Sequence, residues 1–366
     1  MTSRSIALVS ALALTSALLL AGEPHPIAIP APRPVSLKFD KATAAQALAE
    51  LTRQSGNYVV NGVESPSAQF SLELPSTTFW PALDAIARKK HSRVELYPRD
   101  GRLALVRQSA GYVEPPISYS GLFRTSLTRI TTSRDLETNA TSCSARLEVA
   151  WEPSLEPLLL ESSPHGVVVR DDRGALLPTQ AEGSVMVPVD GRLALAIDLP
   201  LPAVPRSTMR YSQLQGKMTA IAPSKMLNFA FDGLDRLAEV SADSPLRRSE
   251  QDGVSCRLTK IKLVPDRWTI QVTVDYPARG LTLESHQSRV GKNEMILESK
   301  DGSKRLSEVG YVIESESERR SIISYHFLDT DKGARGPAGN WKVRFRTPAS
   351  LVEVPFTFAF KDVALP

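Results

Sequence analysis

Short apolar runs separated by prolines constrain the fold of this chain more than any other feature of its sequence. The 366 residues include 27 Pro and 20 Gly, and the prolines are scattered between the apolar runs. A proline inside a helix removes a backbone hydrogen bond and clashes with the preceding turn. The pattern therefore favours many short strands joined by turns, and it argues against an all-helical protein.

The overall composition is that of a globular protein with several domains. Hydrophobic residues make up 42% of the chain and charged residues 23%, whereas disordered chains are poorer in the former. At roughly 100–200 residues per domain, the length predicts two to four domains. The net charge is only +4, which is too small for the basic surface of a nucleic-acid-binding protein. We therefore expect no nucleic-acid partner.

The first residues have the pattern of a secretory signal peptide. Arg4 precedes an uncharged apolar run at residues 6–20, and the small residues Ala21 and Gly22 follow it. The run is shorter than the ~20 residues that span a bilayer. We therefore predict a signal peptide at 1–22, a Pro-rich linker at 23–34, and no integral membrane span after cleavage. The protein would be exported, to the periplasm or out of the cell; the alternative is an uncleaved N-terminal anchor.

Export changes the interpretation of the two cysteines. Cys143 and Cys256 form an even pair, and an exported protein meets an environment that permits disulfides. We therefore consider a disulfide between them, with two buried free thiols as the alternative. Two cysteines with scattered histidines do not make a thiolate zinc cluster, so no metal site is predicted from them.

A strand-then-helix pattern occurs twice in residues 35–108. Apolar residues alternate at 35–39 and then recur at helical spacing at 44–51. The same order returns 35 residues later, at 70–74 and 79–86. Further strands are expected at 58–60, 94–96 and 103–106. This part of the chain is predicted to be a small βαββαββ domain with both helices on one face of a sheet.

The residues of this unit also resemble a known family. The strings V-S-L-K-F-D-K-A-T-A-A-Q-A-L-A-E-L-T-R-Q-S-G (35–56) and F-S-L-E-L-P-S-T-T-F-W-P-A-L-D-A-I-A (70–87) look like the short N-terminal domain (STN) shared by secretins and TonB-dependent receptors. The resemblance implies a periplasmic docking module that binds a protein partner through a sheet edge or a helix face. It covers about a fifth of the chain, and residues beyond 110 depart from both families, so it does not imply a channel or a transporter.

A basic cluster near the end of the second helix is a weak candidate for the docking surface. Arg88, Lys89, Lys90 and Arg93 could meet an acidic partner or lipid headgroups. The alternative is a solvated helix end, where cations complement the helix dipole.

The rest of the chain has the pattern of a duplicated β-domain. Residues 126–130 (S-L-T-R-I) correspond to 257–261 (R-L-T-K-I), and each copy closes on the string F-A-F, at 229–231 and 358–360. Short alternating strands with turns between them predict two tandem immunoglobulin-like β-sandwiches. We expect them at 117–240 and 253–366, joined by a polar linker at 241–252.

Three tryptophans in these domains have two interpretations. Trp151, Trp268 and Trp341 each lie inside an alternating strand, which predicts that they fill the cores. They could instead line a carbohydrate-binding face, where aromatic rings stack on sugars.

A search for reaction chemistry yields no catalytic residues and no cofactor site. Phosphate-binding glycine motifs and the Gly-x-Ser-x-Gly motif are absent from the sequence. A metal site at Glu284, His286 and His326 is a minor alternative, since their spacing does not force them together. The pair Asp171 and Asp172 is expected to be a solvated turn rather than a calcium loop.

These patterns predict an exported, non-enzymatic envelope protein that acts as a docking or scaffold module through residues 35–108. The alternative is an envelope carbohydrate-binding protein or hydrolase with a site on the sandwich loops. Convergence of the Glu284, His286 and His326 side chains would favour that alternative.

Overall fold

The computed structural model describes residues 29–63, 68–98, 101–179, 183–277, 292–328 and 336–366. The prediction of a mainly β protein is confirmed, since strands in several sheets make up most of the regular structure. Helices in the described residues are all too short and too polar to cross a bilayer.

The N-terminal module contains two helices and two small sheets. Strands β1 and β3 pair antiparallel, and β5 lies between β2, to which it is parallel, and β4, to which it is antiparallel. The sequence pattern predicts one sheet, but the strands divide between two, because in the described residues β1 and β3 pair with each other and with no other strand. The elements are β1 (Val35–Ala42), α1 (Ala44–Ser55), β2 (Val60–Gly62), β3 (Phe70–Thr77), α2 (Phe79–Lys89), β4 (Ser92–Glu95) and β5 (Ala104–Arg107).

Local sequence explains where α1 begins and ends. Thr43 accepts a hydrogen bond from the backbone N–H of Gln46, whose side chain in turn accepts from the backbone of Thr43. This reciprocal cap satisfies backbone donors that the first helical turn leaves unpaired. Gly56 ends the helix with a φ of 82°, a left-handed conformation in which a Cβ would be strained. The apolar positions Leu48 and Leu51 are buried, as their spacing predicts.

The second module consists of two antiparallel sheets that pack around one core. In one sheet the order is β13-β8-β7-β6; in the other, β14 pairs with β24 on one edge and with β9 and β10 on the other. The first sheet is made of β6 (Ile117–Ser120), β7 (Phe123–Arg134), β8 (Thr141–Trp151) and β13 (Ala194–Leu201). The second is made of β9 (Leu159–Glu161), β10 (His165–Arg170), β11 (Leu176–Leu177), β12 (Met186–Pro188), β14 (Arg210–Pro223) and β24 (Leu351–Ala364).

The third module also has two antiparallel sheets around its own core. Their strand orders are β15-β23-β19-β20 and β16-β17-β18-β22-β21. The strands are β15 (Met226–Asp232), β16 (Arg248–Gln251), β17 (Val254–Leu263), β18 (Arg267–Asp275), β19 (Glu294–Ser299), β20 (Arg305–Ser307), β21 (Gly310–Glu316), β22 (Arg320–Leu328) and β23 (Trp341–Pro348). A short helix, α3 (Leu234–Glu239), and the 3₁₀ turns η1 (Pro245–Arg247) and η3 (Ala338–Asn340) complete it.

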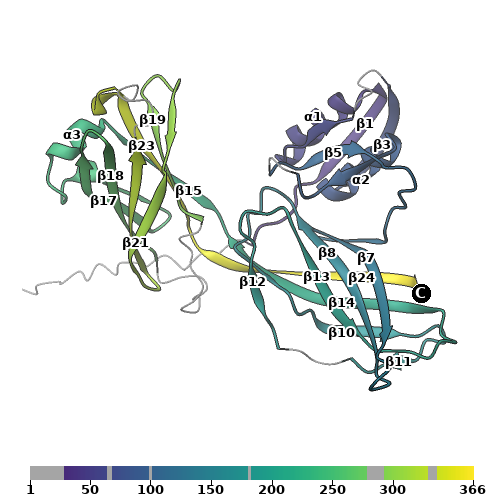
Figure 1. The fold of residues 1–366 in the computed structure, drawn as a ribbon. Coiled ribbons are helices and arrows are strands. Elements are labelled where there is room, and N and C mark those ends of the chain that lie inside the picture. The colour runs from purple at the N-terminus through teal and green to yellow at the C-terminus, as the bar shows by residue number, and fades with distance from the viewer. Residues whose placement is uncertain (1–28, 64–67, 99–100, 180–182, 278–291, 329–335) are drawn as a thin grey trace, which may run out of the picture.

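The predicted division of the β region at 117–240 and 253–366 is wrong for two strands. After β14 the chain crosses into the third module, where β15 pairs with β23 from Met226↔Pro348 to Asp232↔Lys342. After β23 it returns, and β24 pairs with β14 along their length. Figure 1 shows β24, in yellow, running beside β14 in the second module. The two F-A-F strands therefore each belong to the module that sequence order does not assign to them.

The buried cores confirm the prediction for the tryptophans and select one of the two alternatives for the cysteines. Trp151, Trp268 and Trp341 have exposed fractions of 2%, 5% and 4%, so all three fill cores, as their positions in alternating strands predict. Cys143 and Cys256 are both free thiols and form no disulfide. Each is buried in the core of a different module, so the fold keeps the two sulfur atoms apart.

Candidate functional site

The predicted basic cluster lies at the C-terminal end of α2, and most of it is used within the chain. Arg88 Nε lies 2.9 Å from Glu114 Oε2. Lys90 Nζ donates to the Ala68 carbonyl at 2.8 Å and sits 5.9 Å from the ring centroid of Phe70. These contacts tie α2 to the segments before β3 and after β5.

The other two members of the cluster differ from each other. Arg93 forms an ion pair of 2.7 Å with Glu95, its neighbour but one on β4. Lys89 is exposed, and no contact of its ammonium group is found in the described part of the chain. The cluster is therefore not a continuous cationic surface, because carboxylates neutralise two of its four charges.

The N-terminal module is joined to the second module through a buried ion pair on α2. Asp84 and Arg124 side chains are 3% and 7% exposed, and Arg124 Nε lies 2.8 Å from Asp84 Oδ2. Tyr119 also donates to Asp84 Oδ2, at 2.6 Å, and burial followed by the charge of Asp84 raises the pKa of Tyr119. One helical turn away, Trp80 donates from Nε1 to the Leu122 carbonyl at 3.0 Å. Removal of either partner of this ion pair would leave an uncompensated buried charge and would destabilise the folded protein.

A second buried contact lies at the end of α1. Asn57 donates from Nδ2 to Glu152 Oε2 at 2.7 Å and accepts from the Ser154 backbone N–H at 2.9 Å. The other carboxylate oxygen of Glu152 is buried and has no hydrogen-bond partner. Burial raises the pKa of Glu152 to about 7, although the Asn57 hydrogen bond and the charge of Arg33 oppose the shift. This carboxyl group can therefore change its protonation near neutral pH.

The junction leaves α1 and the β1–β3 sheet on the outside of the module. Figure 1 shows α1 and β1 on the side of the N-terminal module that is away from β7 and β8. On the outer face of this sheet, Lys38 and Glu73 are 81% and 67% exposed and form an ion pair of 3.1 Å. In the described residues no strand other than β1 pairs with β3, so each strand keeps one unpaired edge. This sheet therefore has an exposed face and two open edges in the described residues.

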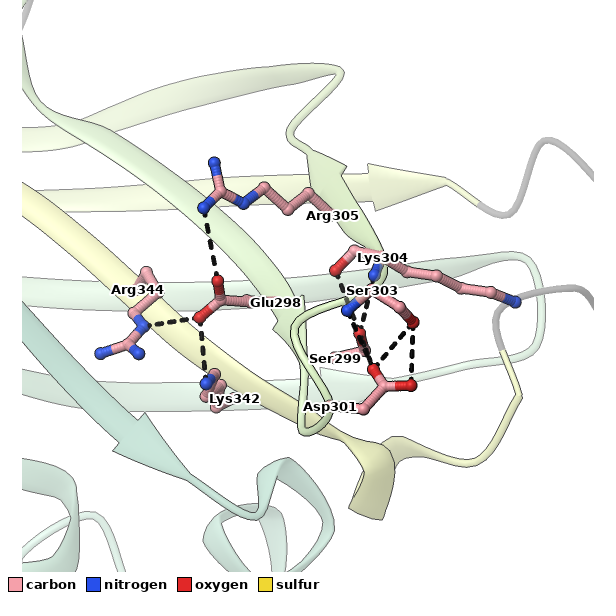
Figure 2. Close-up of polar contacts among 8 residues, drawn as sticks. All are labelled: Glu298, Ser299, Asp301, Ser303, Lys304, Arg305, Lys342 and Arg344. Atoms are coloured by element: carbon pink, nitrogen blue, oxygen red, sulfur yellow. Dashed lines mark hydrogen bonds and ion pairs between the residues drawn. The ribbon is translucent and has the colours of Figure 1, made fainter.

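A polar pocket of about 400 Å³ lies on the third module, beside the turn between β19 and β20. Asp301 accepts hydrogen bonds from the Ser299 hydroxyl at 2.6 Å, from the Ser303 backbone N–H at 3.0 Å and from the Ser303 hydroxyl at 2.8 Å (Figure 2). These bonds, led by the one from Ser299, lower the pKa of Asp301 to about 2. The carboxylate therefore holds the turn in place. The lining residues are Ser299, Lys300, Asp301, Ser303, Lys304, Gly336, Asn340 and Trp341.

Next to this turn, a carboxylate joins three strands of the sheet. Glu298 on β19 lies 3.0 Å from Arg344 Nε and 3.1 Å from Lys342 Nζ, both on β23, and 3.5 Å from Arg305 on β20 (Figure 2). The hydrogen bonds to Arg344 and then Lys342 lower the pKa of Glu298 to about 2. Glu298 is thus an ionised cross-strand link, and a carboxylate held this way is poorly suited to accept a proton near neutral pH.

The structure describes only one residue of the alternative metal site at Glu284, His286 and His326. Glu284 and His286 lie outside the described residues, and His326 Nδ1 is 3.2 Å from Thr269 Oγ1 on the neighbouring strand. Asp171 is half-buried and accepts from the backbone N–H groups of Arg173 and Ala175, so its carboxylate holds the turn that the sequence predicts there. Within the described ranges, no group of three or more His, Cys, Asp or Glu side chains is placed to hold a metal ion.

Sequence reasoning missed the junction residues. The pairs Asp84–Arg124 and Asn57–Glu152 are 40 and 95 residues apart in sequence, so no local pattern connects them. One signal was available: Asp84 stands in a helical stripe of buried apolar residues, where a charge requires a partner.

Comparisons of the chain with protein-family models, with curated proteins and with solved structures found no match.

Proposed function

We propose that this protein is an exported, non-enzymatic adapter of the bacterial cell envelope that binds a partner protein through its N-terminal module. The proposal assigns residues 35–108 to the STN-like family and describes the two β modules as immunoglobulin-like sandwiches. Support for the first assignment comes from the order of elements, strand-helix-strand-strand-helix-strand-strand, together with the sequence pattern at 35–56 and 70–87.

One observation supports the docking role above all others, namely the way the N-terminal module is attached. The N-terminal module is attached to the second module through α2 and Asn57, by a buried ion pair and buried hydrogen bonds. Its other side, with α1 and the β1–β3 sheet, faces outward. An adapter needs this arrangement, because a rigid attachment holds the free surface in a fixed orientation toward a partner.

The carbohydrate-binding or hydrolase alternative has one supporting observation, the polar pocket beside Asp301. Sugar sites commonly offer an exposed aromatic face, but Trp341, which lines the pocket, is only 4% exposed. Asp301 is already bonded to Ser299 and Ser303. We therefore favour the docking function.

Photocrosslinking in living cells tests the proposal. A photoreactive amino acid is placed at Lys38 or at Glu73, on the outer face of the β1–β3 sheet, and at the exposed control position Lys262 on β17. We expect one protein to be crosslinked from positions 38 and 73 and not from 262. Absence of an adduct at both positions, or equal adducts at all three, would contradict docking through this module.

The location of the protein is tested on the same cells. We expect it in the periplasmic or extracellular fraction, with a mass that corresponds to a chain beginning near Glu23. A full-length mass in the cytoplasmic fraction would contradict export.

A further inference from the structure

Four exposed apolar side chains are grouped on β21 and the residue before it, in the third module. Val309, Tyr311, Val312 and Ile313 are 56%, 45%, 48% and 40% exposed. The other large hydrophobic residues with high exposure in the described part of the chain stand singly along the sequence. Single exposed apolar residues are ordinary, whereas a contiguous exposed group marks an interaction surface.

The backbone of β21 is also available for pairing. It is the last strand of its sheet, with the order β16-β17-β18-β22-β21, and its only strand partner in the described ranges is β22. Tyr311 lies opposite Tyr325 of β22, with ring centroids 5.8 Å apart, which anchors one side of the strand. The opposite edge presents a row of backbone groups to which another extended chain can bond. Natural edge strands are usually protected by charges, proline or a bulge. In β21 these features occur only at its end, as two glutamates and a register shift between Ile313 and Ser315, so Gly310–Ile313 remains available for pairing.

The charges along this segment decide what kind of strand can be added. Residues 308–318 contain four glutamates and no lysine or arginine. Glu314 is held by the Ser324 hydroxyl at 2.8 Å, and Glu318 is exposed beyond the end of the strand. An incoming strand with lysine or arginine opposite these carboxylates would gain cross-strand ion pairs.

The same charges argue against a second copy of this chain as the occupant. In an antiparallel two-fold pair centred on Tyr311, Val312 or Ile313, Glu308 would lie opposite Glu314, Glu316 or Glu318, respectively. Like charges directly opposite each other destabilise strand pairing. Each of these registers is therefore unfavourable for self-association.

We infer that β21 is a docking edge for an extended segment of another protein, which adds as a strand and carries alternating apolar residues together with lysine or arginine. The apolar residues pack beside Val309 to Ile313, and the basic residues lie toward Glu314 and Glu318. This site is on the third module, so it is separate from the proposed docking surface of the N-terminal module, and either site can fail without the other.

Peptide selection with the purified full-length protein tests the inference. An unbiased library of extended peptides, each about nine residues long, is selected on the wild-type protein. We expect the enriched peptides to alternate apolar residues and to contain Lys or Arg, and their binding to weaken as ionic strength rises from about 0.05 to about 0.5 M.

Two variants locate the binding. Val312→Lys replaces an exposed apolar side chain of β21 with a charge and should weaken binding of the selected peptides by about tenfold or more. Leu176→Lys is the matched control, because Leu176 is a 62% exposed apolar residue on β11, the edge strand of a sheet in the second module. The Leu176→Lys variant should leave the affinity for the selected peptides unchanged.

The double variant Glu314→Lys/Glu318→Lys tests the role of charge. It should no longer bind the basic peptides and should bind versions of them in which Glu replaces Lys. Equal melting temperatures of the variants and the wild type establish that the fold is intact.

Four results would overturn the inference: no peptide is enriched, the enriched peptides are acidic, Val312→Lys and Leu176→Lys bind the selected peptides equally well, or the wild type is a dimer that Val312→Lys dissociates. The last result would identify a second copy of the chain as the occupant.

Discussion

Glu152 shows how burial changes the chemistry of a single residue. On the surface its carboxyl group would be ionised at neutral pH. At the junction it is 1% exposed, one of its oxygens has no partner, and burial raises its pKa to about 7. The ionised form is therefore disfavoured in the folded protein but not in the unfolded chain.

We predict from this that the protein is less stable above neutral pH than below it. Between pH 4.5, the ordinary pKa, and pH 7, the unfolded chain releases this proton while the folded protein retains it. The free energy of unfolding then falls as pH rises, by up to ~1.4 kcal/mol per pH unit. Below pH 4.5 both states are protonated, and well above pH 7 both are ionised, so the dependence ends there.

The substitution Glu152→Gln should remove this dependence, because its side chain is neutral at every pH and still offers an acceptor to Asn57. Urea unfolding at pH 5, 6, 7 and 8 measures the effect, with Glu73→Gln on the exposed face as the control. We expect Glu152→Gln to be more stable than the wild type at pH 8. If the free energies of unfolding of the wild type and of Glu152→Gln changed with pH in parallel, Glu152 would be ionised in the folded state, and the prediction would be wrong.

At the scale of elements, the pairing of β14 with β24 depends on a glycine. Gly216 lies directly opposite Phe358, and a Cβ at this glycine would meet the Phe358 ring at 2.6 Å. The ring therefore covers the glycine and occupies the space that a side chain would need. Two residues away, Phe356 stacks on Phe123 of the other sheet, with ring centroids 3.9 Å apart. The aromatic residues of β24 thus pack both along its own sheet and across the core.

Gly216→Ala should destabilise the second module by about 1–3 kcal/mol, because the well-packed Phe358 ring must move. Gly183→Ala is the matched control, since a Cβ there meets no atom within 4 Å. Thermal unfolding compares the two variants. Adding Phe358→Leu to Gly216→Ala should restore part of the loss, and equal melting temperatures for the two single variants would contradict the steric argument.

Local sequence patterns predicted the positions of the helices and of several strands. The α1 and α2 helices lie where apolar residues recur at helical spacing, and β7, β8, β17 and β18 lie where they alternate. These elements depend on contacts between residues a few positions apart, so the sequence shows them directly. The assignment of strands to sheets was predicted less well, because pairing depends on partners that are distant in sequence. The division of the N-terminal strands into two sheets was missed for this reason.

At the scale of the whole molecule, the exchange of β15 and β24 connects the second and third modules twice. One link runs from β14 to β15, and the other from β23 back to β24. Arg346 on β23 adds a bidentate ion pair with Glu156, with N–O distances of 2.6 and 2.9 Å. Two covalent crossings and an ion pair limit how the modules can move relative to each other.

A chain that ends at Ser350 should lose the second module and keep the third. Removal of β24 takes away buried apolar side chains that are each worth roughly 1.5–3 kcal/mol, and their sum is as large as the ~5–15 kcal/mol by which a typical domain is stable. The buried residues lost are Leu351, Val352, Val354, Phe356, Phe358, Phe360 and Val363. Limited proteolysis should find the second module digested and the described strands of the third module, from β15 to β23, protected.

Two fragments provide the control. The fragment 224–350 contains every described strand of the third module and should fold, whereas 253–366, the domain expected from sequence order, lacks β15 and should not. The opposite result would mean that the two modules do not exchange strands.

The sequence by itself determined the strand-rich character, the two helices with their spacing, and the tryptophans of the cores, because each follows from residues that are neighbours along the chain. Only the tertiary structure decided which module each F-A-F strand joins, that the two thiols lie in separate cores, and that Asp84 and Glu152 are buried at a junction. Side chains with the same alternating pattern fit either module equally well, and packing with distant partners selects between them.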